Sequence, residues 1–255
     1  MVEALRTQPP EPEPITTPPP PPPLPARAWA AWRRRGARYV WHKAMRRSLG
    51  RFPGWKRKFV YADPRGYWTL RGGEEYFREQ EDQPSRAERS RWLAARIAAY
   101  RPESVLEVGC GYGKQLRAVR RELPDVRLVG LDFSPSQLAL GRAYLGGLGG
   151  IGLVLGSGAR LPFPDGAFDL VFTSAVILHN PPPAAEAIRR ELLRVARRFV
   201  AHNEDTDVTY NRYGYDTAAW YRAEGITLAE SGPIPTDPPP SPSQFCVAEV
   251  ASWPR

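Results

Sequence analysis

The chain contains 255 residues, of which 25% are charged, and carries a formal net charge of +9. This length suits one large domain or two small ones. No run of about 18 apolar residues and no signal-peptide core occurs, and two cysteines cannot build a disulfide framework, so membrane-spanning and disulfide-stabilised classes are excluded. We therefore expect a cytoplasmic protein with reduced cysteines and no transmembrane segment.

The positive charge is concentrated before residue 59. Residues 26–58 contain twelve Lys or Arg and no acidic residue, whereas residues 1–25 contain one Arg and three Glu. Residues 59–255 are therefore close to neutral. The basicity of the chain comes from its N-terminal arm.

Two segments of unusual composition begin the chain. Residues 1–25 hold eleven prolines, so we predict a disordered Pro-rich tail, because proline cannot sustain a helix. Residues 26–60 form a basic arm in which tryptophans such as Trp29, Trp32 and Trp55 interleave with the charges. This pattern suits a polyanion, either RNA or an anionic membrane surface. The alternative is a partly helical, solvated extension whose aromatic side chains dock on the domain.

Residues 61–100 are predicted as an N-terminal helical cap. Residues 85–88 have capping-box spacing and open a helix that runs to the end of this segment. Upstream of that helix lie three aromatic residues, Tyr67, Trp68 and Tyr76. They either line a substrate pocket or pack the helix onto the sheet.

Residues 105–113 read as a strand, a glycine turn and a helix start. Apolar residues lead into glycines at positions 109, 111 and 113, where a missing Cβ lets the backbone turn sharply and a ligand approach closely. The free N–H groups of the following helix favour a negative group. The phosphate-loop pattern fails because Gln115 follows the Gly-Lys pair, and the dinucleotide pattern fails because its third glycine comes one residue early.

What remains, E-x-G-x-G-x-G at residues 107–113, resembles motif I of the class I S-adenosylmethionine-dependent methyltransferases. A second apolar run ends at Asp132, and the resemblance assigns Asp132 to the ribose hydroxyls and Phe133 to the adenine. Residues 156–169 are similar to a third landmark of the family. Ser157 stands where the family usually has an aspartate that binds the adenine amino group, although a serine hydroxyl also accepts a hydrogen bond.

The resemblance implies S-adenosylmethionine as the cofactor and a set of residues that bind it. These residues are Glu107, Gly109, Cys110, Gly111, Gly113, Asp132, Phe133, Ser157, Gly158 and Ser174.

The resemblance also implies an α/β fold over residues 101–255. This fold is a Rossmann-like, seven-stranded, mostly parallel sheet with helices on both faces and an antiparallel last strand. The pattern predicts a helix capped by Ser134, strands at residues 151–155 and 168–174, and a fifth strand that starts near residue 198. The last two strands are expected at residues 226–230 and 245–250, after a loop and short helix that carry several tyrosines.

Two histidines are candidate catalytic bases, because histidine titrates near neutral pH. His179 lies in a stretch that resembles the family's V-L-x-H-x-x-D segment. His202 ends the predicted fifth strand beside Asn203, Glu204 and Asp205, a polar group that we expect to face the pocket. Of the two, His202 is favoured, because these polar neighbours could orient it. The alternative for each is a hydrogen-bonded structural histidine. No metal-ligand spacing occurs, so we predict a metal-independent enzyme.

The predicted function is methyl transfer to a small-molecule acceptor, with a hydroxyl of a sugar or natural-product scaffold as the favoured target. One alternative is an RNA methyltransferase recruited by the basic arm. A second is a non-catalytic binding protein built on the cofactor fold, for which Ser157 is the only local argument. The sequence does not indicate an oligomeric state.

Overall fold

The computed structural model describes residues 23–48, 52–237 and 241–253. The chain divides into two compact units, residues 1–44 and 45–255. The described part of the first unit belongs to helix α1 (Leu24–Ser48), which bends at Gly36, where φ is +80°. The predicted disordered tail therefore lies almost entirely outside the described residues, and its last two positions are helical. None of the helices in these three ranges is long and apolar enough to cross a membrane.

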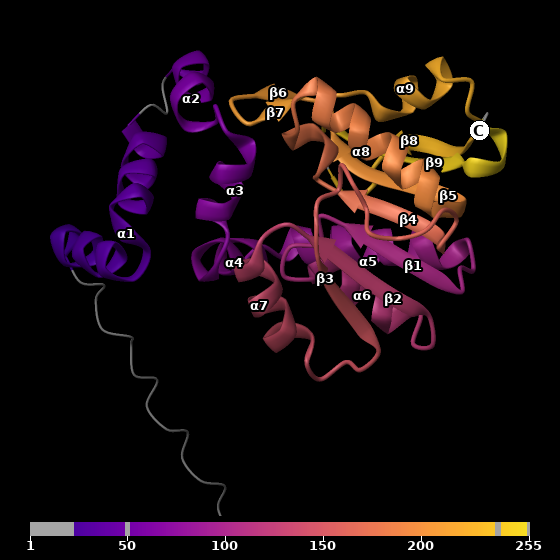
Figure 1. The fold of residues 1–255 in the computed structure, drawn as a ribbon, viewed down its shortest axis with the longest axis horizontal. Coiled ribbons are helices and arrows are strands. Elements are labelled where there is room, and N and C mark those ends of the chain that lie inside the picture. Colours follow the sequence, from indigo (N-terminus) through magenta and orange to yellow (C-terminus); the bar gives the residue numbers. More distant parts are fainter. Residues whose placement is uncertain (1–22, 49–51, 238–240, 254–255) are drawn as a thin grey trace, which may run out of the picture. The chain divides into compact units, whose positions relative to one another are not determined.

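The second unit is built on a seven-stranded sheet in the order β3-β2-β1-β4-β5-β9-β8 (Figure 1). Its strands are β1 (Ser104–Val108), β2 (Arg127–Asp132), β3 (Ile151–Leu155), β4 (Phe168–Ser174), β5 (Ala196–Asp205), β8 (Leu228–Pro233) and β9 (Ser243–Glu249). Strands β1 to β5 pair in parallel, and β9 runs antiparallel to both of its neighbours. The predicted mostly parallel sheet with an antiparallel last strand is confirmed.

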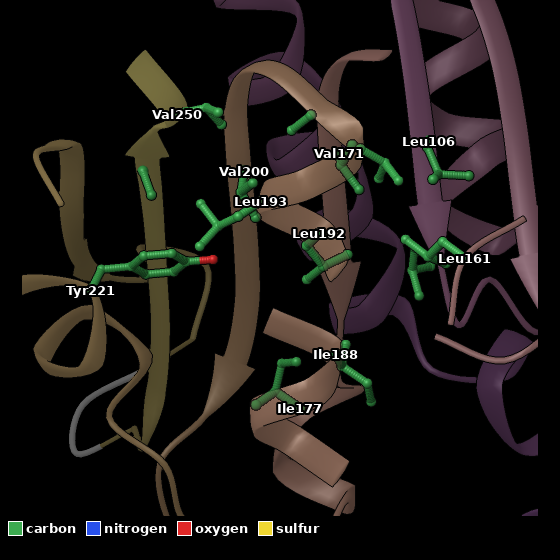
Figure 2. Packing of buried hydrophobic residues seen from close by; sticks show 14 of the residues in the cluster. Leu106, Leu161, Val171, Ile177, Ile188, Leu192, Leu193, Val200, Tyr221 and Val250 are labelled. Carbon is green, nitrogen blue, oxygen red and sulfur yellow. The ribbon is translucent and has the colours of Figure 1, made fainter. Parts of the chain in front are cut away.

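Helices cover both faces of the sheet: α5 (Pro84–Ala99), α6 (Lys114–Glu122) and α7 (Pro135–Leu145) pack on one face, and α8 (Pro182–Val195) and α9 (Thr217–Ala223) on the other. The remaining helical elements are α2 (Pro53–Val60), α3 (Pro64–Arg71), α4 (Glu74–Glu81) and the short 3₁₀ turns η1 (Ile177–His179) and η2 (Val250–Ser252). On one face, Leu106 and Val171 of the sheet pack with Ile188 and Leu192 of α8 (Figure 2). Because side chains alternate along a strand, Val105 faces the other way, into a second core with α5, α6 and α7.

Local signals set most element boundaries as predicted, with one correction. Ser134 caps α7, since its Oγ accepts a hydrogen bond from the Gln137 N–H at 3.4 Å. The capping box predicted at Ser85 is wrong. Helix α5 already begins at Pro84, and its N-cap residue, Gln83, makes no side-chain hydrogen bond to the helix. A proline at the first helical position starts the helix because its fixed φ already suits it.

The segment before α5 folds into three short helices, α2 to α4, whose positions the sequence analysis did not give, although it predicted residues 61–100 as a helical cap. Helix α3 begins after Asp63, whose carboxylate accepts the Gly66 N–H at 2.9 Å. A third apolar cluster joins Val60, Tyr61 and Tyr67 of this segment. Residues 45–60, which the sequence analysis gave to the basic arm, thus belong to the second compact unit.

One further element follows β5. Strands β6 (Val208–Thr209) and β7 (Arg212–Tyr213) form a two-stranded hairpin, separate from the main sheet, in a stretch predicted as a loop.

Candidate active site

A cavity of about 400 Å³ lies at the carboxyl ends of β1, β2 and β4. Its walls come from the loops that follow these strands and β3, from η1, and from the start of α8. Residues of α3 and α4 complete the lining. Ligands of parallel α/β sheets bind at this edge, where the strands end and the helix N-termini begin.

The loop after β1 forms one wall through Gly109 and Gly111. Both have positive φ, +76° and +54°. A Cβ on Gly109 would lie 2.4 Å from a methyl carbon of Val176, whereas a Cβ on Gly111 would meet nothing closer than 3.6 Å. The loop therefore requires glycine at position 109 for space as well as conformation, and position 111 leaves room for a ligand beside the backbone.

Asp132 is held rigidly at the end of β2. Its two carboxylate oxygens accept the N–H groups of Gly111 and Ser134, each at 2.8 Å. Burial raises the pKa of Asp132, and these backbone donors act against that rise. Phe133, the next residue, also lines the cavity, with the Arg65 guanidinium 5.6 Å from its ring centre.

Three residues of the predicted cofactor set lie behind the wall and not on it. Glu107 and Cys110 are buried, and burial raises the pKa of both side chains well above their ordinary values. The Cys110 thiol is therefore protonated and inert. Gly113 adopts the left-handed conformation before α6, where a Cβ would strike Leu145 at 2.6 Å. All three shape the loop from inside, and the cavity wall does not include them.

The remaining predicted cofactor residues do line the cavity: Ser157, Gly158 and Ser174. The Ser157 Oγ accepts only a long hydrogen bond, 3.4 Å, from the Ala159 N–H. Its hydroxyl hydrogen therefore remains available to a ligand. The Ser174 Oγ accepts a hydrogen bond from the Asn203 side-chain amide at 2.8 Å, which fixes this hydroxyl at the end of β4.

Gln137 of α7 was not predicted as a site residue. It lines the cavity, and its buried side-chain oxygen, Oε1, has no hydrogen-bond partner among the described residues. The sequence marked Gln137 only as part of a helix start. A buried amide oxygen without a partner is costly, so a ligand that donates a hydrogen bond here would relieve that cost.

The sequence left two possible roles for Tyr67, Trp68 and Tyr76. Two of these residues, Trp68 and Tyr76, line the cavity. Their ring centres lie 5.8 Å apart at an interplanar angle of 75°. Tyr67 is buried behind them and shares a hydrogen bond with the hydroxyl of Tyr210 at 2.9 Å. Trp68 and Tyr76 therefore have the pocket-lining role considered from the sequence, whereas Tyr67 packs within the helical cap and against the β6–β7 hairpin region, not between the α5 helix and the sheet.

His179 lies in η1 at the cavity wall. Its Nδ1 is 2.6 Å from the backbone carbonyl oxygen of Asn211. A carbonyl can only accept, so the proton is on Nδ1 and Nε2 carries a lone pair, with no hydrogen-bond partner for Nε2 in the described ranges. Burial lowers the pKa of His179 to about 4, against the opposing effect of the Asn211 carbonyl. The imidazole is thus neutral at pH 7.

His202 occupies a different environment, and its predicted role is corrected. Only 1% of it is exposed, and it is not part of the cavity wall. Its Nδ1 and Nε2 are bonded to the hydroxyls of Thr173 and Tyr221, at 2.7 and 2.8 Å. Burial, together with the positive charge of Arg189, lowers its pKa to about 3. Both ring nitrogens already make hydrogen bonds within the protein, so His202 has no free nitrogen with which to take a proton from a methyl acceptor.

The polar group beside His202 supports the site from behind. Glu204 accepts the N–H groups of Val176, Ile177 and Leu178 at 3.0 to 3.3 Å, and also the Thr173 hydroxyl at 2.8 Å. This buried carboxylate therefore holds the backbone turn that carries His179.

The β6–β7 hairpin, which supplies the Asn211 carbonyl, is clasped by an arginine from α2. The Arg57 guanidinium donates hydrogen bonds to the carbonyls of Thr209 and Arg212, one on each side of Asn211, and lies 4.6 Å from the centre of the Tyr213 ring. A residue of the predicted basic arm thus fixes the turn that orients His179.

Residues 105–198 match the methyltransferase domain family. Ajmaline N-methyltransferase from Rauvolfia serpentina is 36% identical over 175 residues, which are 61% of this chain and 56% of the relative. Sterol 24-C-methyltransferase from Eremothecium gossypii is 28% identical over 145 residues, 52% of this chain and 38% of the relative. The chain therefore spans about half, or less, of the length of these relatives.

The fold is also found in solved structures. The PH0226 protein from Pyrococcus horikoshii OT3 superimposes with a TM-score of 0.57 at 18% identity, over 70% of this chain and 99% of that one. This likeness shows the fold. The family match and the sequence relatives, together with the glycine loop, indicate that residues 105–198 form a methyltransferase domain of the class I S-adenosylmethionine-dependent type.

The cavity fits S-adenosylmethionine, the cofactor of this family. The Asp132 carboxylate is placed to accept hydrogen bonds from ribose hydroxyls, and the unpartnered Gln137 oxygen is placed to accept one from a cationic or N–H group. Space beside Gly111 admits a ligand against the backbone. Leu131, Phe133 and other apolar residues supply the flat, dry wall that an adenine ring needs.

Proposed function

We propose that this domain transfers a methyl group from S-adenosylmethionine to a hydroxyl oxygen of a small-molecule acceptor, and that His179 receives the proton of that hydroxyl. The observation that carries the proposal is the orientation of His179. Its Nδ1–H is committed to the Asn211 carbonyl, so its Nε2 lone pair is the free basic group at the cavity wall.

Methyl transfer to a hydroxyl requires that the acceptor is aligned with the methyl group and that a weak base is near. The bound cofactor supplies an electrophilic methyl group on a positively charged sulfur. Trp68 and Tyr76 are placed to align the acceptor and exclude water. A hydroxyl becomes strongly acidic as its oxygen gains the methyl group, so a neutral imidazole with a pKa of about 4 is basic enough to take the proton.

The size and lining of the cavity support a small acceptor. The wall near His179 is formed by Trp68, Tyr76 and apolar side chains, and residues 59–255 carry almost no net charge. The two sequence relatives are named for small molecules, ajmaline and a sterol, although for methylation at nitrogen and carbon. We also propose a cytoplasmic location, which the buried free thiols of Cys110 and Cys246 support.

The cofactor part of the proposal is tested by calorimetric titration of S-adenosylhomocysteine, the demethylated product. We expect micromolar binding to the wild type and at least roughly tenfold weaker binding to Asp132→Ala, because hydrogen bonds to a charged group are lost. The matched control is Asp125→Ala, an exposed aspartate just before β2, which should bind like the wild type. Absence of binding to the wild type would refute the proposal.

The role of His179 is tested first by ¹⁵N NMR, since the chain has three histidines. One of them should show a protonated Nδ1 and a free Nε2 at pH 7, with a pKa near 4, and its signal should disappear in His179→Ala. With an acceptor found by screening for labelled methyl transfer, His179→Ala should lower kcat roughly 100-fold and leave cofactor affinity unchanged. An unchanged kcat would remove His179 from the mechanism.

A further inference from the structure

Helix α2 presents an aromatic face to the outside of the second unit. Phe52, Trp55 and Phe59 are spaced three and four residues apart and are 60%, 62% and 44% exposed. The opposite side of the helix points inward, where Val60 is buried and Arg57 clasps the hairpin. A helix at a protein surface normally directs its apolar side inward, so this outward aromatic face calls for an explanation.

The aromatic rings on this face are paired with each other. The Trp55 and Phe59 rings stack with centres 5.5 Å apart at an interplanar angle of 27°. Each ring therefore has one face already covered. Single-stranded nucleic acid binds by stacking its bases on free aromatic faces, whereas an aromatic helix face flanked by basic residues suits the membrane interface.

Positive charge accompanies the aromatic face. Lys58 is exposed beside Phe59, with its Nζ 5.7 Å from the ring centre. The stretch from residue 26 to residue 58 contains no Asp or Glu. The charged side chains of this stretch are therefore all of the sign that an anionic surface attracts.

The first unit carries the same combination by itself. Trp29 and Trp32 are 55% and 46% exposed, and their rings pair at 4.6 Å. Trp41 is 54% exposed. Among the described residues, six of the eight large apolar side chains that are exposed lie between positions 29 and 59. Exposed large apolar side chains are thus concentrated in and beside the basic stretch, and this argues against a general excess of surface hydrophobicity.

We propose that the outward face of α2, formed by Phe52, Trp55, Phe59 and Lys58, docks on an anionic lipid bilayer. The aromatic rings enter the interfacial layer, where Trp and other aromatic side chains are favoured, and Lys58 meets anionic headgroups. The exposed tryptophans of α1 strengthen the attachment. The domain then works at a lipid surface while its catalytic unit remains outside the bilayer.

The proposal is tested by flotation of the full chain with vesicles of phosphatidylcholine containing about one third phosphatidylglycerol, and with pure phosphatidylcholine. The wild type should float with the anionic vesicles and weakly with the neutral ones. The double variant Trp55→Ser/Phe59→Ser should bind the anionic vesicles at least roughly tenfold more weakly. The matched control is Val208→Ser, which removes an exposed apolar residue of the hairpin and should leave flotation unchanged.

Three outcomes would overturn the proposal. The wild type could fail to float with anionic vesicles, a result that does not depend on any variant folding. The double variant, with an unchanged melting temperature, could float as well as the wild type. Alternatively, Trp55 and Phe59 could be needed for binding a single-stranded RNA or for forming a dimer in solution, with no vesicle binding by the wild type.

Discussion

The cavity has two sides that are built in different ways. The glycine-loop side, at residues 109–111, 131–134 and 156–159, comes from successive strand ends and is shaped by backbone and glycines. The histidine side combines Trp68, His179 and the β6–β7 hairpin, segments separated by up to 145 residues, and is held by side chains.

The difference shows where each side is vulnerable. The glycine-loop side leaves little room for an added carbon atom at Gly109, Gly156 and Gly158, where a Cβ would lie within 3 Å of a neighbouring side chain. The histidine side depends on residues that never reach the cavity, since Arg57 and Glu204 hold the hairpin and the turn in place. Mutations at the two sides should therefore produce different kinds of damage.

The largest effect should follow from Gly109→Ala. The new Cβ would adopt φ of +76° and lie 2.4 Å from Val176, so both backbone strain and overlap oppose it. We expect a loss of about 3 kcal/mol in the free energy of unfolding, together with loss of S-adenosylhomocysteine binding. Denaturant unfolding and calorimetry measure the two effects.

Gly147→Ala is the matched control for this prediction. A Cβ at Gly147 would meet nothing within 4 Å, and the residue does not have the positive φ of Gly109. Its stability should equal that of the wild type or slightly exceed it, because alanine has fewer unfolded conformations. If Gly109→Ala were as stable as this control, the account of the glycine-loop side would be wrong.

The glycine-loop side could be predicted from the sequence because its information is local. Strands β3 and β4 have the predicted boundaries, and Ser134 caps α7 as expected. Buried parallel strands are continuous apolar runs, and a glycine turn followed by a helix is visible within ten residues. The position of Asp132 follows from the same repeat of strand and loop.

His179, Trp68 and Tyr76 were candidates from the sequence, but the contacts that hold the histidine side could not be predicted, because they join residues far apart in the chain. His179 is oriented by Asn211, 32 positions away, and Asn211 is placed by Arg57. His202 was misjudged because side chains alternate along a strand. Asn203 reaches Ser174 at the cavity wall, so its neighbour His202 points into the opposite core.

The sequence also contains a local signal for the start of α3 that was not used in the prediction. Asp63 followed by Pro64 is the same cap-and-proline start that correctly located the helix at Ser134. Applied at Asp63, it would have predicted α3 and brought Trp68 into a helix that lines the cavity.

The buried pair of His202 and Glu204 behind the histidine side predicts a pH dependence of stability. The folded pKa of His202, about 3, lies below its ordinary value of about 6.5. Between these two pKa values the His202 side chain binds a proton in the unfolded chain but not in the folded protein, so the free energy of unfolding falls as the pH drops. His202 alone should account for a loss of about 2 kcal/mol between pH 7 and pH 5.

His202→Gln isolates this contribution, because buried carboxyl groups with raised pKa, such as Glu204, titrate in the opposite sense. The measurement is denaturant unfolding of wild type and variant at pH 7 and pH 5. The variant should lose about 2 kcal/mol less than the wild type on acidification. Equal losses would mean that His202 is protonated in the folded protein and that its hydrogen bonds are misassigned.

The smallest effect, and the one that best separates the two sides, should follow from Arg57→Met. Methionine keeps the length of the side chain but cannot donate to the Thr209 and Arg212 carbonyls. The hairpin loosens, the Asn211 carbonyl shifts, and His179 loses its fixed tautomer. We expect kcat to fall roughly tenfold while S-adenosylhomocysteine affinity stays the same.

Lys58→Met removes the same charge from the same helix without touching the hairpin, so it should keep the wild-type kcat on a soluble acceptor. NMR supplies a readout that a general loss of stability would not change. In Arg57→Met the signal of protonated Nδ1 should broaden or give way to a mixture of tautomers, and in Lys58→Met it should persist. If both variants kept a single His179 tautomer while only Arg57→Met lost turnover, Arg57 would act on the acceptor by another route. Something other than the Asn211 carbonyl would then orient His179.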